Sequence, residues 1–166
     1  MKKVIILLII VVSLFSLMGC SKNEVKKPKS EIESFAGYIV IKDDILYFDE
    51  VEIIEPEDKE RIKELGLDED LPPTGFEVLN ENQEEVTYEL ADEVNYTFTD
   101  INLNFIKESE SGGNRIYNTT KKDEFIKHLG DYNLNDIPLF EQTIPYFIEV
   151  QDGKVISITE EFKFTI

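Results

Sequence analysis

Hydrophobic and polar residues alternate over much of this 166-residue chain with the period of two that half-buried strands require. The clearest case lies near the end, where the apolar side chains at positions 144, 146, 148 and 150 share one face. Asp152-Gly153 follows and predicts a type I′ turn, after which residues 155–166 return as a long strand. This part of the chain is therefore predicted to be a β-hairpin.

A second hairpin is predicted near the start of the folded region. Residues 36–42 (AGYIVIK) and 45–54 (ILYFDEVEII) are rich in β-branched and aromatic side chains, and Asp43-Asp44 between them predicts a tight turn. Three further segments between the two hairpins are predicted to be strands: 76–80, 84–90 and 94–100.

Two segments carry the signals of short helices. Residues 57–65 (EDKERIKEL) place acids first and bases later, and Gly66 follows as a C-cap. The second helix is predicted to begin at Thr120, with Asp123 at capping-box spacing, and to end at Gly130.

Together these patterns predict about seven or eight strands and two short helices. The predicted fold class is mainly β (α+β), with a single antiparallel β-rich domain over residues 35–166 that forms a small OB-like barrel or a sandwich. Because a small barrel needs large side chains in its core, we expect most aromatic residues inside. The alternative is an exposed binding face built from some of the aromatic residues, Tyr38, Tyr47, Tyr132, Tyr146 and Phe147.

The first twenty residues follow a different pattern. Two lysines precede an apolar run of roughly 15 residues, which is shorter than the ~20 that a membrane-spanning helix needs. The run ends in Leu17-Met18-Gly19-Cys20, which resembles the lipobox of bacterial lipoprotein signal peptides. The resemblance implies that residues 1–19 are a signal peptide, cleaved before Cys20, and that Cys20 carries a diacylglyceryl thioether. An uncleaved N-terminal anchor helix is the alternative.

Charge separates the segment after the lipobox from the rest. Residues 20–34 are predicted to be the lipidated cysteine and a flexible tether, and lysines outnumber Glu24 in its first part. The domain that follows has 11 Lys+Arg and 32 Asp+Glu, and the whole chain has a net charge of -18. Such a surface argues against nucleic acid as a partner and repels anionic lipids, so we expect a cationic, neutral or metal-bridged partner. Alternatively, the negative charge mainly keeps the domain soluble.

Little catalytic chemistry can be assigned from residue types. With one cysteine and one histidine, a disulfide framework and a multi-histidine metal centre are both excluded. His128 is predicted to be an ordinary surface or helix-end histidine rather than a general base. Only one cofactor is considered, Ca²⁺, because Asp131, Asn133 and Asn135 have oxygen side chains at positions 1, 3 and 5 of an EF-hand-like loop. That match fails at Asp136, where the loop's glycine should stand.

Three stretches resemble small lipoproteins of Gram-positive bacteria with no assigned function: GYIVIKDDILYFDEVEII, EDKERIKELGL and PYFIEVQDGKVISITEEF. The resemblance implies a location and no chemistry. We therefore expect a lipoprotein anchored to the cell membrane through Cys20, on the extracytoplasmic face. It is expected to act as a non-catalytic binding module for an envelope protein or a cationic ligand. The alternatives are a carboxylate-dependent envelope hydrolase and a weak divalent-cation-binding protein.

Overall fold

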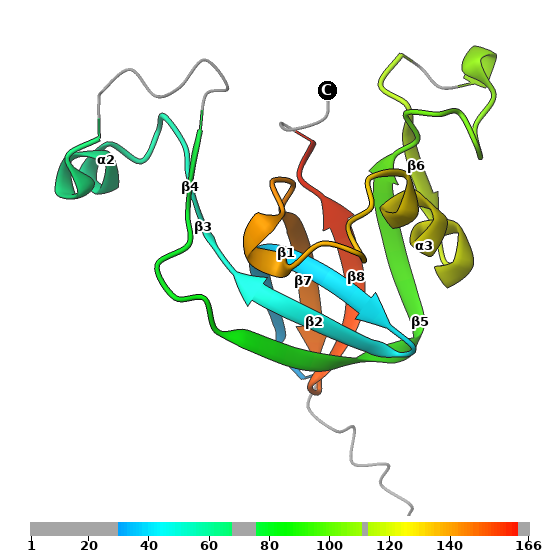
Figure 1. Ribbon diagram of the computed structural model, residues 1–166, viewed down its shortest axis with the longest axis horizontal. Coiled ribbons are helices and arrows are strands. Elements are labelled where there is room, and N and C mark those ends of the chain that lie inside the picture. The colour runs from blue at the N-terminus through cyan, green and yellow to red at the C-terminus, as the bar shows by residue number, and fades with distance from the viewer. Residues whose placement is uncertain (1–29, 68–75, 111–112, 163–166) are drawn as a thin grey trace, which may run out of the picture.

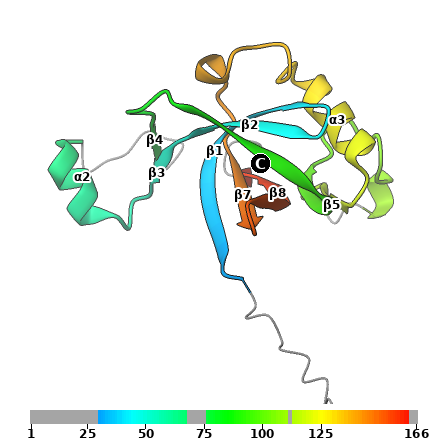
Figure 2. The same ribbon diagram turned by 90° about the horizontal axis from the view of Figure 1, so that it is seen from below.

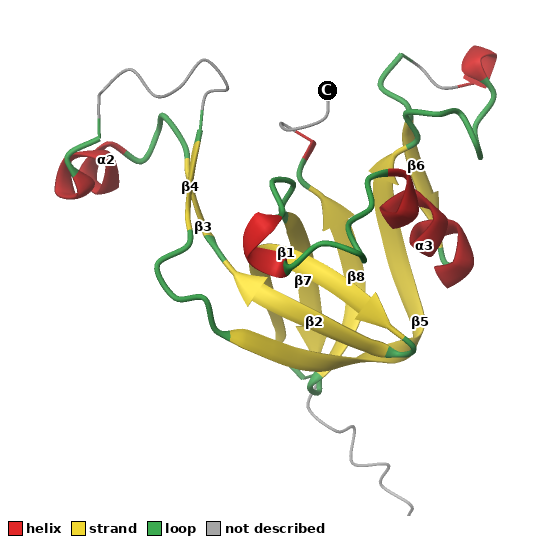
Figure 3. Ribbon diagram, in the orientation of Figure 1, coloured by secondary structure: helices red, strands yellow, loops and turns green. Residues whose placement is uncertain are grey.

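The computed structural model describes residues 30–67, 76–110 and 113–162 (Figure 1), and the predicted signal peptide and Cys20 lie outside these ranges. Strands make up most of the regular structure (Figure 3). The elements in chain order are β1 (Ile32–Lys42), β2 (Ile45–Glu50), β3 (Glu52–Ile54), α2 (Lys59–Leu65), β4 (Glu77–Leu79), β5 (Glu85–Thr99), β6 (Ile116–Thr119), α3 (Lys122–Asp131), β7 (Tyr146–Gln151) and β8 (Lys154–Glu160). Two single 3-10 turns, Glu108–Glu110 and Leu139–Glu141, complete the set.

Five strands close into a barrel. Strand β1 pairs with β2 and β7, β8 pairs with β7 and β5, and β5 returns to β2. All of these pairs are antiparallel except β5–β8, which is parallel. This order, with α3 inserted between the third and fourth barrel strands, is that of an OB-like barrel, so the predicted fold class is confirmed.

Both predicted hairpins are confirmed, although the returning strand predicted over residues 155–166 ends at Glu160. Strands β1 and β2 are joined at Asp43, which adopts a φ of 54°. Strands β7 and β8 are joined by Asp152 and Gly153, whose φ values of 54° and 78° are both positive, as a type I′ turn requires. Strand β1 begins at Ile32, which pairs with Gln151, so the last three residues assigned to the tether belong to the barrel.

The predicted strand over residues 45–54 is two strands. The chain leaves the barrel at Val51, and β3 pairs with β4 in a separate two-stranded ribbon that carries α2. Figures 1 and 2 show this ribbon on one side of the barrel and α3 with β6 on the other. Gly66 ends α2 in the left-handed conformation, with φ 65°, as predicted from the sequence.

Conversely, the strands predicted at 84–90 and 94–100 are one strand of 15 residues, β5. Its first part pairs with β2 and its second part with β6. Strand β8 pairs with both parts, and its register shifts between Leu90 and Asn95. Asp92 and Glu93 are exposed at this shift, which explains why the sequence pattern suggested a break. Strand β6 was not predicted.

The second helix was predicted to run from Thr120 to Gly130, but α3 begins at Lys122 and ends at Asp131. Helix α3 has Lys121 at its N-cap position, with no side-chain cap, and it continues through Gly130 to Asp131. Thr119, rather than Thr120, provides the local hydrogen bonds, because its hydroxyl accepts the N–H of Lys121 and donates to Glu124. Capping chemistry is present, but one residue earlier than the sequence spacing suggested.

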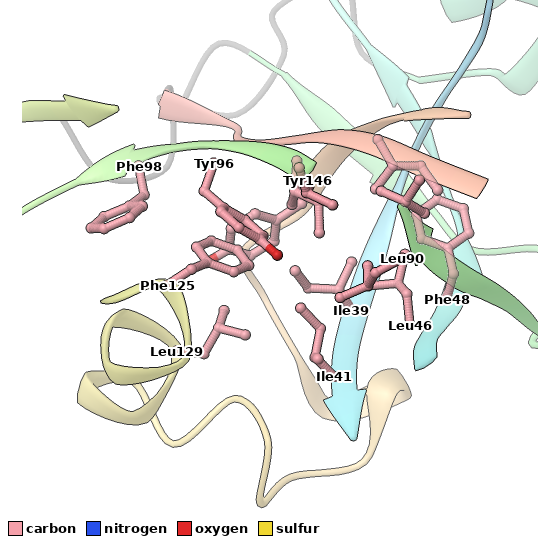
Figure 4. Close-up of a cluster of buried hydrophobic side chains, with 14 of the residues drawn as sticks. Ile39, Ile41, Leu46, Phe48, Leu90, Tyr96, Phe98, Phe125, Leu129 and Tyr146 are labelled. Atoms are coloured by element: carbon pink, nitrogen blue, oxygen red, sulfur yellow. The ribbon is translucent and has the colours of Figure 1, made fainter. Parts of the chain in front are cut away.

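The barrel core is closed at one end by α3. Phe125 and Leu129 point from the helix toward the barrel interior, and the rings of Phe125 and Tyr96 stack with centroids 4.6 Å apart (Figure 4). Both helix side chains are fully buried, and burial of each such side chain contributes roughly 1.5–3 kcal/mol to stability. No helix in the parts of the chain that the structure describes is long and apolar enough to cross a membrane.

Candidate functional site

An acidic groove lies where the β3–β4 ribbon leaves the barrel. It has a volume of about 360 Å³, within the range of ordinary ligand sites. Its walls come from the end of β2, the start of β3, the end of β4 and the loop into β5. The lining residues are Glu50, Val51, Glu52, Leu79, Glu81, Asn82, Glu84 and Val86.

One of the four groove carboxylates is paired with a base. Arg61 of α2 donates from Nε and Nη2 to the two carboxylate oxygens of Glu52, each at 2.8 Å. These hydrogen bonds lower the pKa of Glu52 below its usual value. Among the described residues, no base bonds to Glu50, Glu81 or Glu84, and all three are exposed. Arg61 interacts with Glu81 only through space, so the groove presents an excess of negative charge beside apolar side chains.

A second polar cluster is buried beneath α3. His128 is 3% exposed and stacks on Phe98, with ring centroids 4.2 Å apart. Its Nε2 lies 3.2 Å from the Tyr146 hydroxyl and 3.7 Å from Oε2 of Glu160, which accepts the N–H of Thr99. His128 lies in the last turn of α3, as the helix-end prediction has it, but the prediction of a surface position is wrong because the side chain is buried. Position 128 lies three residues after Phe125 and one before Leu129, and this helical spacing already placed it on the apolar face.

Burial controls the protonation of this cluster. Burial lowers the pKa of His128 to about 4, because a buried imidazolium loses its hydration. The negative charges of Asp131 and Asp100 oppose this shift only in part. Burial, with the nearby Glu160 carboxylate, raises the pKa of Tyr132 to about 12. General acid–base catalysis favours groups with pKa values near the working pH, so these values do not favour catalysis at His128.

The cavity beside this cluster is small, at about 130 Å³, and its lining includes Asp100, His128 and Tyr132. Asp100 is 2% exposed and is fully engaged, because its carboxylate accepts the backbone N–H groups of Asn104, Phe105 and Ile106. Asp100 therefore organises the loop after β5.

The predicted calcium ligands follow α3. Asp131 accepts a hydrogen bond from the Asn104 side chain at 2.9 Å, and Asn135 accepts the N–H of Ile41 at 3.1 Å. Asn133 adopts a left-handed conformation with φ 57°. Across residues 30–67, 76–110 and 113–162, no three His, Cys, Asp or Glu side chains are grouped to hold a metal ion. Calcium binding at Asp131, Asn133 and Asn135 stays a prediction.

No known protein family, curated protein or solved structure matches this chain. Its function must therefore be argued from its own geometry.

The five candidate aromatic residues do not share one face. Tyr146 is fully buried in the barrel core. Tyr38 and Tyr47 belong to a smaller apolar cluster outside β1 and β2, packed with Leu139. Phe147 is 39% exposed on β7. The acidic groove was not predicted either, because its residues come from two segments about thirty positions apart, and only the net charge pointed toward it.

Proposed function

We propose that this protein is a membrane-anchored extracytoplasmic lipoprotein whose barrel domain is a non-catalytic binding module for a positively charged envelope component. The observation that carries the proposal is the acidic groove, in which Glu50, Glu81 and Glu84 lack a bonded base among the residues described. A concave surface of one charge sign concentrates ligands of the opposite sign and speeds their association.

The groove also favours a particular kind of positive group. Val51, Leu79 and Val86 line it together with the carboxylates, and Val86 is 41% exposed. Lysine and arginine side chains have an apolar stem and a charged head, and they can satisfy both kinds of surface at once. A lysine- or arginine-containing protein segment is therefore the partner class that fits best.

A charge-neutralised groove tests this proposal. In titration calorimetry with a tetralysine peptide, the combined change Glu50→Gln, Glu81→Gln and Glu84→Gln is expected to weaken binding about tenfold. The expectation follows because three exposed charge pairs contribute on the order of 0.5 kcal/mol each.

The matched control removes the same charge elsewhere. Asp92→Asn, Glu93→Gln and Glu149→Gln replace three exposed acids outside the groove. This control is expected to bind tetralysine nearly as well as wild type. Equal losses in the two triple variants would mean that only net charge matters and would remove the groove from the proposal.

The anchor is tested separately, on residues outside the described ranges. Protein purified from host membranes is expected to begin at Cys20 and to carry a diacylglyceryl thioether, as measured by mass spectrometry of the N-terminal peptide. The Cys20→Ser variant is expected to keep residues 1–19, because cleavage follows lipidation. A free Cys20 thiol with the leader still attached would contradict the proposed anchor.

A carboxylate-dependent hydrolase is the second candidate, since the groove places acids from two segments around one hollow. Such an enzyme needs a carboxylic acid whose pKa is raised, so that it can donate a proton. The pKa of Glu52 is lowered instead, by the hydrogen bonds from Arg61, so Glu52 does not suit that role. Hydrolysis of wall glycan by the wild-type protein, lost in the groove variant, would favour the enzyme.

A further inference from the structure

Asp49 and Asn80 join the barrel to the base of the β3–β4 ribbon. Asp49 lies near the end of β2, and Asn80 directly follows β4. The Asn80 side chain donates to Oδ2 of Asp49 at 2.8 Å, across 31 positions of sequence. The Asp49 side chain is only 3% exposed.

The remaining polar atom of each side chain is a buried oxygen that accepts no hydrogen bond: Oδ1 of Asp49 and Oδ1 of Asn80. Two such oxygens on one hydrogen-bonded pair are unusual, because buried acceptors in folded proteins nearly always have a donor. The carboxylate makes the situation more costly, since a buried charge is normally paired with an opposite charge.

The surroundings of Asp49 supply no positive charge. Glu50 follows it in the chain, and Glu85 is its cross-strand partner on β5. Tyr38 faces it across β1, and the pKa of Tyr38 is raised by burial and then by the Asp49 carboxylate. No lysine or arginine of the described ranges bonds to Asp49. The carboxylate is therefore buried among acids without a counter-charge.

We propose that Asp49 and Asn80 form a binding site for a single monovalent alkali cation such as Na⁺, held by Oδ1 of each side chain. A carboxylate and an amide carbonyl are the hard oxygen ligands that such ions prefer, and one positive charge balances one carboxylate. A bridging water would satisfy both oxygens but would leave the charge uncompensated. The ion holds the ribbon against the barrel, and both of its ligands lie next to residues of the acidic groove, Glu50 and Glu81.

The test is thermal unfolding of the full chain in detergent, followed by circular dichroism at constant ionic strength. The Na⁺ concentration is raised by replacing tetramethylammonium chloride stepwise with sodium chloride. The tetramethylammonium cation is too large for a buried site, so it keeps the ionic strength constant without binding there. The midpoint of wild type is expected to rise by about 5 °C and then to level off, as for a saturable site. The Asp49→Asn variant keeps the shape of the side chain without its charge, and its midpoint is expected to be insensitive to Na⁺.

Glu85→Gln is the matched control, because it removes one acid next to Asp49 without touching the pair; its midpoint is expected to follow wild type. The line width of the sodium-23 NMR resonance supplies a second measurement that does not depend on unfolding. Wild type and Glu85→Gln are expected to broaden this resonance, and Asp49→Asn is not. The proposal is overturned if the wild-type midpoint ignores Na⁺ or if Asp49→Asn responds as wild type does. It is also overturned if acidification, rather than Na⁺, produces the stabilisation that depends on Asp49, since a proton would then occupy the site.

Discussion

Acidification from pH 6.5 to pH 4 is expected to reduce the free energy of unfolding of this protein by about 3 kcal/mol through His128 alone. The unfolded chain binds a proton at His128 below pH 6.5, whereas the folded protein binds it only below about pH 4. Within that window the unfolded state therefore takes up more protons, and stability falls as pH falls. Above pH 6.5 both states are neutral at this site, and the full contribution is present.

Urea unfolding at several pH values, compared between wild type and His128→Gln, measures this effect. Glutamine can still hydrogen-bond to the Tyr146 hydroxyl, so the variant is expected to fold, with some loss of stability at pH 7 because the stacking on Phe98 is gone. Carboxylates also titrate in this range, and those contributions are common to the two proteins and cancel in the difference. Parallel pH profiles between pH 6.5 and 4 would show that His128 is not held neutral by burial.

The second large effect is expected at Gly37. Strand β1 changes partner here from β7 to β2, and Gly37 is paired with both Tyr146 and Glu50. A β-carbon at this position would overlap the backbone carbonyl of Asp49 and lie about 2.5 Å from the Phe48 ring. Because a backbone atom cannot move aside as a flexible side chain can, Gly37→Ala is expected to cost about 3 kcal/mol.

Gly130→Ala provides the matched control, since it makes the same chemical change in α3. No atom lies within 4 Å of a β-carbon added there, and helical alanine is favoured over glycine by roughly 0.5–1 kcal/mol. Urea unfolding should therefore show opposite signs for the two substitutions. A loss at Gly37 no greater than the effect at Gly130 would contradict the close packing of Gly37 against Asp49 and Phe48.

The structural roles of Gly37 and His128 depend on their tertiary contacts. In the sequence, Gly37 is a weak point in a strand pattern and His128 is one polar residue in a short helix. In the structure, Gly37 pairs with both β2 and β7, and His128 is enclosed by aromatic rings. The contacts of Gly37 with Phe48 and Asp49 come from a neighbouring strand, so local patterns do not reveal them. Helical spacing places His128 on the apolar face of α3, but only the packing shows which rings enclose it.

The local features follow from the sequence alone: the alternating strands, the tight turns at Asp43 and Asp152, the glycine end of α2 and the strongly acidic charge. These depend on side-chain periodicity and on the backbone preferences of a few residues, which act over short stretches of chain. Contacts between distant segments establish three further features: residues 85–99 form one bent strand, aromatic rings enclose His128, and acids from residues 50–52 and 81–84 share a groove. Barrel closure pairs residues as far apart in the chain as Asp49 with Glu85 and Ile32 with Gln151, and the energy of those contacts belongs to the pairing as a whole rather than to either segment alone.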